Sequence, residues 1–169
     1  MAKIKLKKFN ISLKTFIISC IIIISVLIVG ISYYVFNKVY YREYKEDLAN
    51  SMIENSHMLE DKLRSNGMTV DNPQDLNYQI DTVAAMLDAR IMVVNSEYRI
   101  IKDSFGERTN SIIVNSDVIK VMSGKSDYYL EELSHEYIRY IYPVVGEDGV
   151  VRVIIFNASL ENARELSKV

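Results

Sequence analysis

The sequence predicts an α+β protein in which an N-terminal transmembrane helix continues into a domain with a five-stranded antiparallel sheet. Three observations predict this fold class. Residues 15–36 carry no charged side chain and are rich in isoleucine. Apolar residues recur at helical spacing in residues 37–66 and 74–87. Beyond residue 89, five short segments have the composition of strands and are separated by turn residues or a short helix.

Residues 15–36 have the length and composition of a membrane span. At a rise of about 1.5 Å per helical residue they extend over about 33 Å, enough to cross a hydrocarbon core of about 30 Å. Residues 1–14 contain five lysines and no acidic residue. The positive-inside rule therefore predicts a basic cytoplasmic tail over 1–14 and an extracytoplasmic location for the residues after 36. A cleaved signal peptide is the alternative, but its apolar region would be only about 7–15 residues long.

The composition of the remaining chain limits its partners. The protein has 20 basic and 22 acidic residues, and five of the basic ones lie in the tail, so residues 15–169 carry a net charge of −7. This acidic balance argues against nucleic acid as a partner and leaves cationic ligands open. The only cysteine, Cys20, lies inside the apolar segment, so the external domain has no disulfide. A chain of this length can form one small domain with its own core.

Two helices are predicted before the sheet. The first covers residues 37–66, has no proline or glycine between Ile31 and Asn66, and is expected to continue directly from the membrane helix. The second covers residues 74–87. The apolar stripe of the first helix is Tyr44, Leu48, Met52, Leu59 and Leu63, with Asn55 filling the gap, and that of the second is Leu76, Ile80, Val83, Ala84 and Leu87. The first stripe either packs only on its own domain or also supports a homodimer through the long helix.

The sheet is predicted from short apolar runs and their turns. Asn115 or Ser116 is expected to cap a short helix that Gly124 ends, and the run Gly146-Glu147-Asp148-Gly149 predicts a hairpin. Ser159 is expected to cap a last helix that is still running at Val169. The predicted strands are residues 90–95, 98–103, 126–133, 136–145 and 150–157, and the short helix covers residues 117–123.

Three segments carry a resemblance to a known family. They are Ala89–Asn95 followed by Arg99–Ser104, then Asn115–Gly124, and finally Tyr137–Val145 with Gly149–Leu160. In these segments the chain resembles the extracytoplasmic sensor region of bacterial membrane-bound histidine kinases, similar to the phosphate-regulon and cell-wall sensor kinases. The resemblance implies a PAS-like domain of the single-Cache (PDC) type over residues 37–158. It also implies an exit helix over 159–169 that leads to a second membrane span after Val169.

The resemblance implies the signal-sensing part of a two-component system. The alternatives are the sensor domain of a chemotaxis receptor or of a cyclic-dinucleotide enzyme, and a stand-alone membrane-tethered binding protein. The sequence contains no glycine-rich phosphate loop, no HExxH, no cysteine ligand pair and no nucleophile elbow. We therefore predict no catalytic residue, no cofactor and no metal site in this chain. The signal is an unidentified small ligand or an envelope partner.

Four residues are candidates for ligand contact: Arg139, Tyr142, Tyr98 and Arg90. Arg139 lies in the middle of an aromatic-rich strand, and its planar guanidinium suits an anionic ligand such as a carboxylate. It could instead pair with Glu131 across the hairpin or reach water. Arg90 opens the first strand and Asp103 closes the second, so these two could form a cross-strand ion pair. The tyrosines at 98, 128, 129, 140 and 142 either line a pocket or fill the sheet core.

One polar cluster marks the third predicted turn. Its members are Glu131, Glu132, His135 and Glu136. Carboxylates and imidazole can bind a divalent cation, but charged hairpin turns are commonly solvated, and solvation is the favoured interpretation here.

Overall fold

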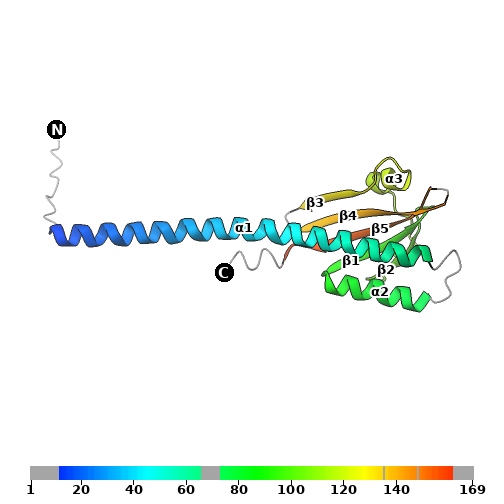
Figure 1. Ribbon diagram of the computed structural model, residues 1–169, viewed down its shortest axis with the longest axis horizontal. Helices are drawn as coiled ribbons and strands as arrows, with labels where there is room; N and C mark the ends of the chain where they lie inside the picture. Colours follow the sequence, from blue (N-terminus) through cyan, green and yellow to red (C-terminus); the bar gives the residue numbers. More distant parts are fainter. Residues whose placement is uncertain (1–11, 66–72, 135, 148, 162–169) are drawn as a thin grey trace, which may run out of the picture. The chain divides into compact units, whose positions relative to one another are not determined.

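The computed structural model describes residues 12–65, 73–134, 136–147 and 149–161. The chain divides into two compact units, Met1–Tyr40 and Tyr41–Val169. Helix α1 (Leu13–Ser65) begins in the first unit and ends in the second (Figure 1). The sequence therefore correctly predicts helix from the apolar segment to Ser65.

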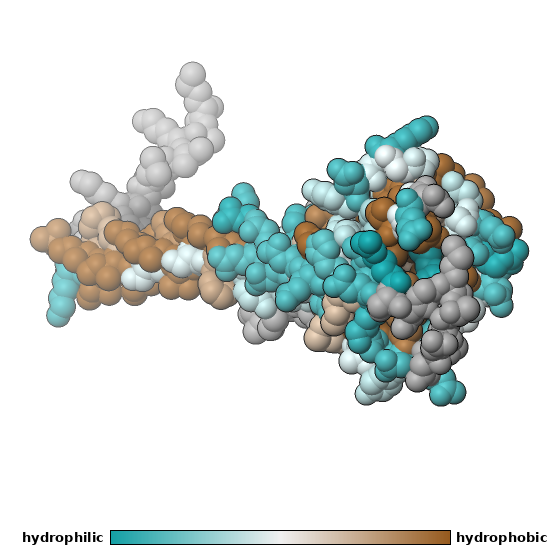
Figure 2. All heavy atoms as spheres, turned by 45° about the vertical axis from the view of Figure 1, so that its right-hand side comes forward, coloured by the Kyte–Doolittle hydropathy of each residue, from teal (hydrophilic) through white to brown (hydrophobic). Residues whose placement is uncertain are grey.

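In the first unit, α1 presents apolar side chains to its surroundings (Figure 2). Every large apolar residue from Leu13 to Phe36 is exposed, including the isoleucines at 21–24. Among the described residues, the helix Leu13–Arg64 is the one long and apolar enough to cross a membrane. Exposed apolar surface of this extent calls for an apolar medium or a partner to cover it. The first unit is thus a candidate membrane span.

The second unit is built on a five-stranded sheet with the order β2-β1-β5-β4-β3. All four neighbouring pairs are antiparallel. The strands are β1 (Ala89–Asn95), β2 (Ile100–Asp103), β3 (Tyr129–Ser134), β4 (Tyr137–Gly146) and β5 (Gly149–Ser159). The predicted α+β class with an antiparallel sheet is therefore confirmed. The chain order differs from the spatial order because β5, the last strand, lies at the centre between β1 and β4.

One face of the sheet packs against two helices, the 41–65 part of α1 and α2 (Pro73–Met86), and we call it the α1 face. Both predicted helical stripes are buried there, and Tyr44 and Leu76 are partly buried. One position in the α1 stripe was predicted wrongly. Ser56, not Asn55, is buried between Met52 and Leu59, and its hydroxyl donates to the carbonyl of Ile53 at 2.7 Å. A serine can be buried at this point because the helix backbone itself supplies the acceptor.

The other face packs against α3 (Ser116–Met122) and carries a second core cluster, and we call it the α3 face. Asn115 is the N-cap of α3: its side-chain oxygen accepts from the backbone N–H of Asp117 at 2.8 Å and of Val118 at 3.3 Å. Gly124 follows the helix with a φ of 69°, a conformation that glycine adopts without strain. The sheet residues in this cluster are Met92, Val94, Ile100, Ile141, Val153 and Ile155.

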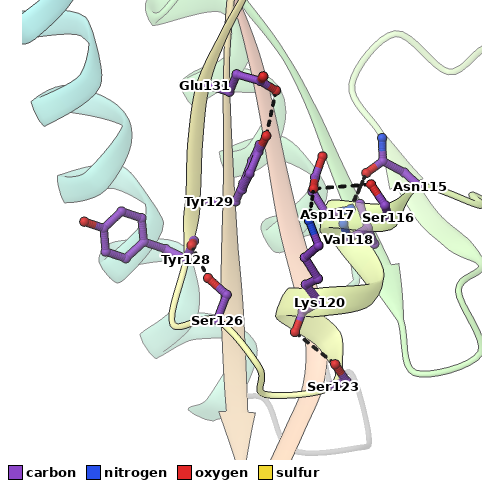
Figure 3. A network of polar contacts seen from close by, with 10 residues as sticks. All are labelled: Asn115, Ser116, Asp117, Val118, Lys120, Ser123, Ser126, Tyr128, Tyr129 and Glu131. Carbon is purple, nitrogen blue, oxygen red and sulfur yellow. Dashed lines mark hydrogen bonds and ion pairs between the residues drawn. The ribbon is translucent and has the colours of Figure 1, made fainter.

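Most predicted element boundaries shift by one to three residues, and two strand starts have a clear local cause. β2 begins at Ile100 instead of Tyr98, because the Asn95 side chain accepts from the N–H groups of Glu97 and Arg99 and closes a turn in which Tyr98 has a φ of 60°. β3 begins at Tyr129 instead of Ser126, whose hydroxyl donates to the carbonyl of Tyr128 (Figure 3). At the predicted exit helix, the N–H of Glu161 donates to Ser159 Oγ at 3.1 Å, while residues 162–169 lie outside the described residues.

Candidate functional site

A row of polar residues crosses the α3 face over four neighbouring strands. In the strand register Arg90 of β1 lies opposite Asn157 of β5, Asn157 lies opposite Arg139 of β4, and Arg139 lies opposite Glu131 of β3. Residues directly opposite each other in an antiparallel pair project to the same face. The next row along the strands, from Met92 to Ile141, belongs to the buried core. The polar row therefore borders the core of the α3 face.

Arg90 is bound by two carboxylates of this chain. Its Nε and Nη2 donate to the two oxygens of Asp103 at 2.9 and 2.6 Å, and its Nη1 lies 2.9 Å from Glu107. The predicted ion pair between Arg90 and Asp103 is thus confirmed. The Arg90 guanidinium also lies 5.4 Å from the centre of the Phe105 ring. Each nitrogen of the Arg90 guanidinium thus already has a carboxylate of this chain as a partner.

Asp103 is buried and fixes the loop that follows β2. Besides the Arg90 fork, its carboxylate accepts from the backbone N–H of Phe105 at 3.2 Å and of Arg108 at 2.9 Å. Burial alone would raise the pKa of the Asp103 carboxyl, but the hydrogen bonds from Arg90, Arg108 and Phe105 together lower it below its ordinary value. Asp103 therefore remains ionised and holds both the arginine and the loop.

In the part of the chain that the structure describes, Arg139 has no such carboxylate partner. Its Nε donates to Asn157 Oδ1 at 2.8 Å, and the side chain is half-buried. Within the described residues, no carboxylate oxygen lies within 4.0 Å of its guanidinium, and its terminal nitrogens make no hydrogen bond. The cross-strand ion pair with Glu131 that the sequence left open is not formed.

Glu131 is bound by Tyr129 instead. The Tyr129 hydroxyl donates to Glu131 Oε2 at 2.8 Å, as Figure 3 shows, whereas Tyr128 projects to the other side of β3. The hydrogen bond to Glu131 raises the pKa of Tyr129 to about 12. The hydroxyl is therefore protonated, and able to donate, over the physiological pH range.

The other two candidate residues are not near Arg139 in the sheet. Tyr142 is on the α1 face, where its hydroxyl donates to Glu60 at 2.7 Å and lies 3.0 Å from His57 Nδ1. Burial, followed by the hydrogen bond to Glu60, raises the pKa of Tyr142. Tyr98 lies in the turn between β1 and β2 and packs against the core of the α3 face. The four candidates therefore do not converge on a single site.

A set of polar contacts joins the sheet to α1, and it was not predicted from the sequence. Glu132 of β3 accepts from Lys45 Nζ at 2.9 Å and from the Tyr41 hydroxyl at 3.1 Å. Arg152 of β5 donates to the carbonyl of Leu63 at 3.3 Å, in the last turn of α1. With the contact from Tyr142 to Glu60, each of β3, β4 and β5 is tied to α1. The alternation of Glu131 and Glu132 along β3 was the available signal that the second glutamate faces a helix.

The polar cluster at the third turn does not form a cation site in the residues that the structure describes. Glu131 and Glu132 lie on opposite faces of β3, each with its own donors, and His135 lies outside the described residues. In the described part of the chain no three His, Cys, Asp or Glu side chains are grouped so that they could hold a metal ion.

No protein-family model matches the chain, and no curated protein matches it. Among solved structures, the chain is similar to the crystal structure of the sensor domain of DcuS from E. coli. The two are 14% identical, the match covers 66% of this chain and 99% of that chain, and the TM-score is 0.44.

Proposed function

We propose that this chain is the extracytoplasmic signal-sensing part of a membrane-bound sensor histidine kinase, with its N-terminus in the cytoplasm. One observation carries the proposal. The helix that is the candidate membrane span also supplies Leu48, Met52, Leu59 and Leu63 to the core of the sheet domain. A binding domain whose core includes its own membrane helix has a direct physical route for passing a change in shape to the membrane.

The contacts between the sheet and α1 supply the mechanism. Tyr142, Glu132 and Arg152 project from three adjacent strands and bind α1 at Glu60, Lys45 and the carbonyl of Leu63. Packed interfaces of this kind switch between discrete arrangements instead of deforming continuously. A ligand that prefers one shape of the sheet would shift α1 by as much as its affinities for the two shapes differ.

The proposed assembly is a homodimer at the membrane. The apolar stripe of α1 from residue 48 to 63 is buried in its own domain, so it is not available to a second copy. The exposed apolar residues of α1 lie mainly between Leu13 and Phe36. We therefore assign the proposed dimer contact to the membrane part of α1, where helices associate by close packing within the lipid.

The proposed orientation can be tested by cysteine labelling. Two variants on a Cys20→Ser background carry Ala2→Cys in the tail or Glu97→Cys in the exposed turn between β1 and β2. A membrane-impermeant maleimide added to intact cells should label Glu97→Cys at once and Ala2→Cys only after lysis, because positive residues are retained in the cytoplasm. Labelling of Ala2→Cys in intact cells, with Glu97→Cys protected, would reverse the proposed topology.

The proposed relay can be tested in a chimera. Residues 1–161 replace the input region of a sensor kinase whose autophosphorylation can be measured, and Tyr142→Phe and Glu60→Gln are introduced separately. Tyr142→Phe removes the hydrogen bond of 2.7 Å between β4 and α1, and Glu60→Gln replaces its charged acceptor with a neutral one. A bond to a charged group is worth about 1.5–3 kcal/mol, so we expect basal kinase output to shift by about tenfold or more.

The matched control is Glu54→Gln, an exposed glutamate on the same helix. It changes the charge as Glu60→Gln does but breaks no contact with the sheet, so its output should equal that of the parent chimera. The relay proposal fails if Tyr142→Phe and Glu60→Gln, expressed at parent level, leave kinase output unchanged.

A further inference from the structure

We infer that Arg139 anchors a carboxylate-binding site on the α3 face, and that Tyr129 keeps this site open by holding Glu131 away from the arginine. The inference rests on the proposed sensing function and names the chemistry of its ligand. It depends on three features of the polar row: the hydrogen-bond partners of Arg139, those of Glu131, and the carboxylates bound to Arg90.

The guanidinium of Arg139 is held in place by a hydrogen bond but, among the described residues, is not paired with a carboxylate. The bond from Nε to Asn157 Oδ1 at 2.8 Å fixes the guanidinium on its Nε side. The two terminal nitrogens form the opposite end of the planar fork, and within the described residues they have no acceptor. Two parallel N–H groups in one plane match the two oxygens of a carboxylate, which is why arginine binds carboxylates in a bidentate manner.

Glu131 is the carboxylate of this chain best placed to bind the Arg139 guanidinium in place of a ligand. It is the cross-strand partner of Arg139 on β3, and opposite residues of an antiparallel pair have Cβ atoms about 4.5–5.5 Å apart. A glutamate at this distance would ordinarily pair with the arginine and occupy it. Instead, the Tyr129 hydroxyl donates a hydrogen bond to Glu131 Oε2 at 2.8 Å, from a position two residues earlier on the same strand (Figure 3). Tyr129 thus acts as a positioning residue for Arg139 without itself contacting the ligand.

The other acidic group near Tyr129 is likewise satisfied. Asp117 of α3 is bound by Lys120 Nζ at 3.0 Å and lies at the start of its helix, where a carboxylate is favoured. In Figure 3, Asp117 and Lys120 project from α3 on the same side of β3 as Tyr129.

Arg90, in the same row, is an arginine that is already paired with carboxylates of this chain. Two carboxylates of this chain, Asp103 and Glu107, are bound to its three nitrogens. The row therefore contains one arginine with carboxylates bound and one without. This contrast assigns the ligand to Arg139 and gives Arg90 a structural role.

The test measures carboxylate binding to the full chain in lipid nanodiscs. Sodium acetate and disodium succinate serve as probes, with ionic strength held constant by sodium chloride, and the midpoint of thermal unfolding is followed by near-ultraviolet circular dichroism. A ligand that binds only the folded state raises this midpoint with concentration. We expect both probes to raise the midpoint of the wild type and neither to raise that of Arg139→Gln. Arg139→Lys, which keeps the charge but lacks the fork, should bind at least about tenfold more weakly.

Tyr129→Phe is the decisive variant. It removes a single hydroxyl, frees Glu131 to neutralise Arg139, and should weaken succinate binding by about tenfold or more. The double variant Tyr129→Phe/Glu131→Gln removes the competing charge and should recover wild-type binding. A merely structural role of Tyr129 would not be rescued in this way.

Four outcomes would overturn the inference. A wild-type midpoint that responds to neither probe, or equal responses of the wild type and Arg139→Gln, would remove the site. Undiminished succinate binding by Tyr129→Phe would remove the role of Tyr129. An Arg139-dependent response to inorganic phosphate, with none to the carboxylates, would exclude the carboxylate class. None of these outcomes bears on the labelling and chimera experiments, which do not involve Arg139, so failure of the site and failure of the sensing function are distinguishable.

Discussion

Replacing Asp103 with alanine should destabilise the sheet domain by about 3–5 kcal/mol, because it removes one partner of an ion pair whose carboxylate is buried and takes the acceptor from several hydrogen-bond donors. The Asp103 residue is 2% exposed and accepts four hydrogen bonds, two from Arg90 and two from the N–H groups of Phe105 and Arg108. All four donors lose their acceptor in the variant. For a domain whose total stability is about 5–15 kcal/mol, this loss threatens folding itself.

Urea unfolding of the full chain in detergent micelles measures this effect, with near-ultraviolet circular dichroism as the probe. The chain has twelve tyrosines and no tryptophan, so the signal reports tyrosine packing. The control is Lys120→Ala, which removes an ion pair at 3.0 Å on the exposed side of α3. That loss should stay below about 0.5 kcal/mol. Equal effects of the two substitutions would show that the Asp103 contacts do not stabilise the fold.

The same carboxylate should make stability depend on pH in a defined direction. Because its pKa is lowered in the folded protein, Asp103 releases its proton more readily there than in the unfolded chain. Its contribution is therefore fully present above the unfolded value of about 3.9 and is lost as pH falls through the lower folded value. The difference in unfolding free energy between the wild type and Asp103→Asn should accordingly shrink as the pH is lowered below about 4. A difference that grows on acidification would contradict the assigned sign.

The sequence could predict those structural features that depend on residues close together along the chain. The helical stripes of α1 and α2, the Asn115 cap and the pair of Arg90 with Asp103 all join residues within one element or one hairpin. In each case the spacing alone brings the side chains together. The central place of β5 in the sheet could not be read in the same way. Its pairing with β1 joins Ala89 to Ala158 across almost the whole domain, and no turn sets that register.

The pairing of Arg139 with Asn157 could not be predicted because of one irregularity in the register of β4 and β5. Counting back from the hairpin at Gly146 and Gly149 with regular pairing would place Phe156 opposite Arg139. The register shifts by one residue between Val144 and Val145, so that Asn157 takes this place. A slip of one residue exchanges the two faces of a strand, and the polar row across the α3 face depends on it. Tyr142 was predicted to contact a ligand, like Arg139, because the sequence does not reveal its partner. That partner, Glu60, lies on a helix far away in the sequence.

Leu59→Ala should destabilise the domain by about 2–5 kcal/mol, since it removes a fully buried side chain from the interface between α1 and the sheet. Leu59 is 0% exposed, whereas its neighbour Met58 is 41% exposed on the same turn. Met58→Ala is therefore the matched control, with an expected effect within about 0.5 kcal/mol. The urea midpoint followed by tyrosine circular dichroism distinguishes the two variants.

This pair of variants also separates the stability of the sheet from its coupling to the membrane helix. Leu59 lies between Ser56 and Leu63, in the part of α1 that Tyr142 and Arg152 contact. If the sheet and α1 form one cooperative unit, as the proposed relay needs, Leu59→Ala should lower the hydrogen-exchange protection of β4 and β5 together with that of α1. If the loss is confined to α1 while the strands keep wild-type protection, the helix can separate from a folded sheet. In that case a change in the sheet could not be transmitted through α1, and the relay would need another path.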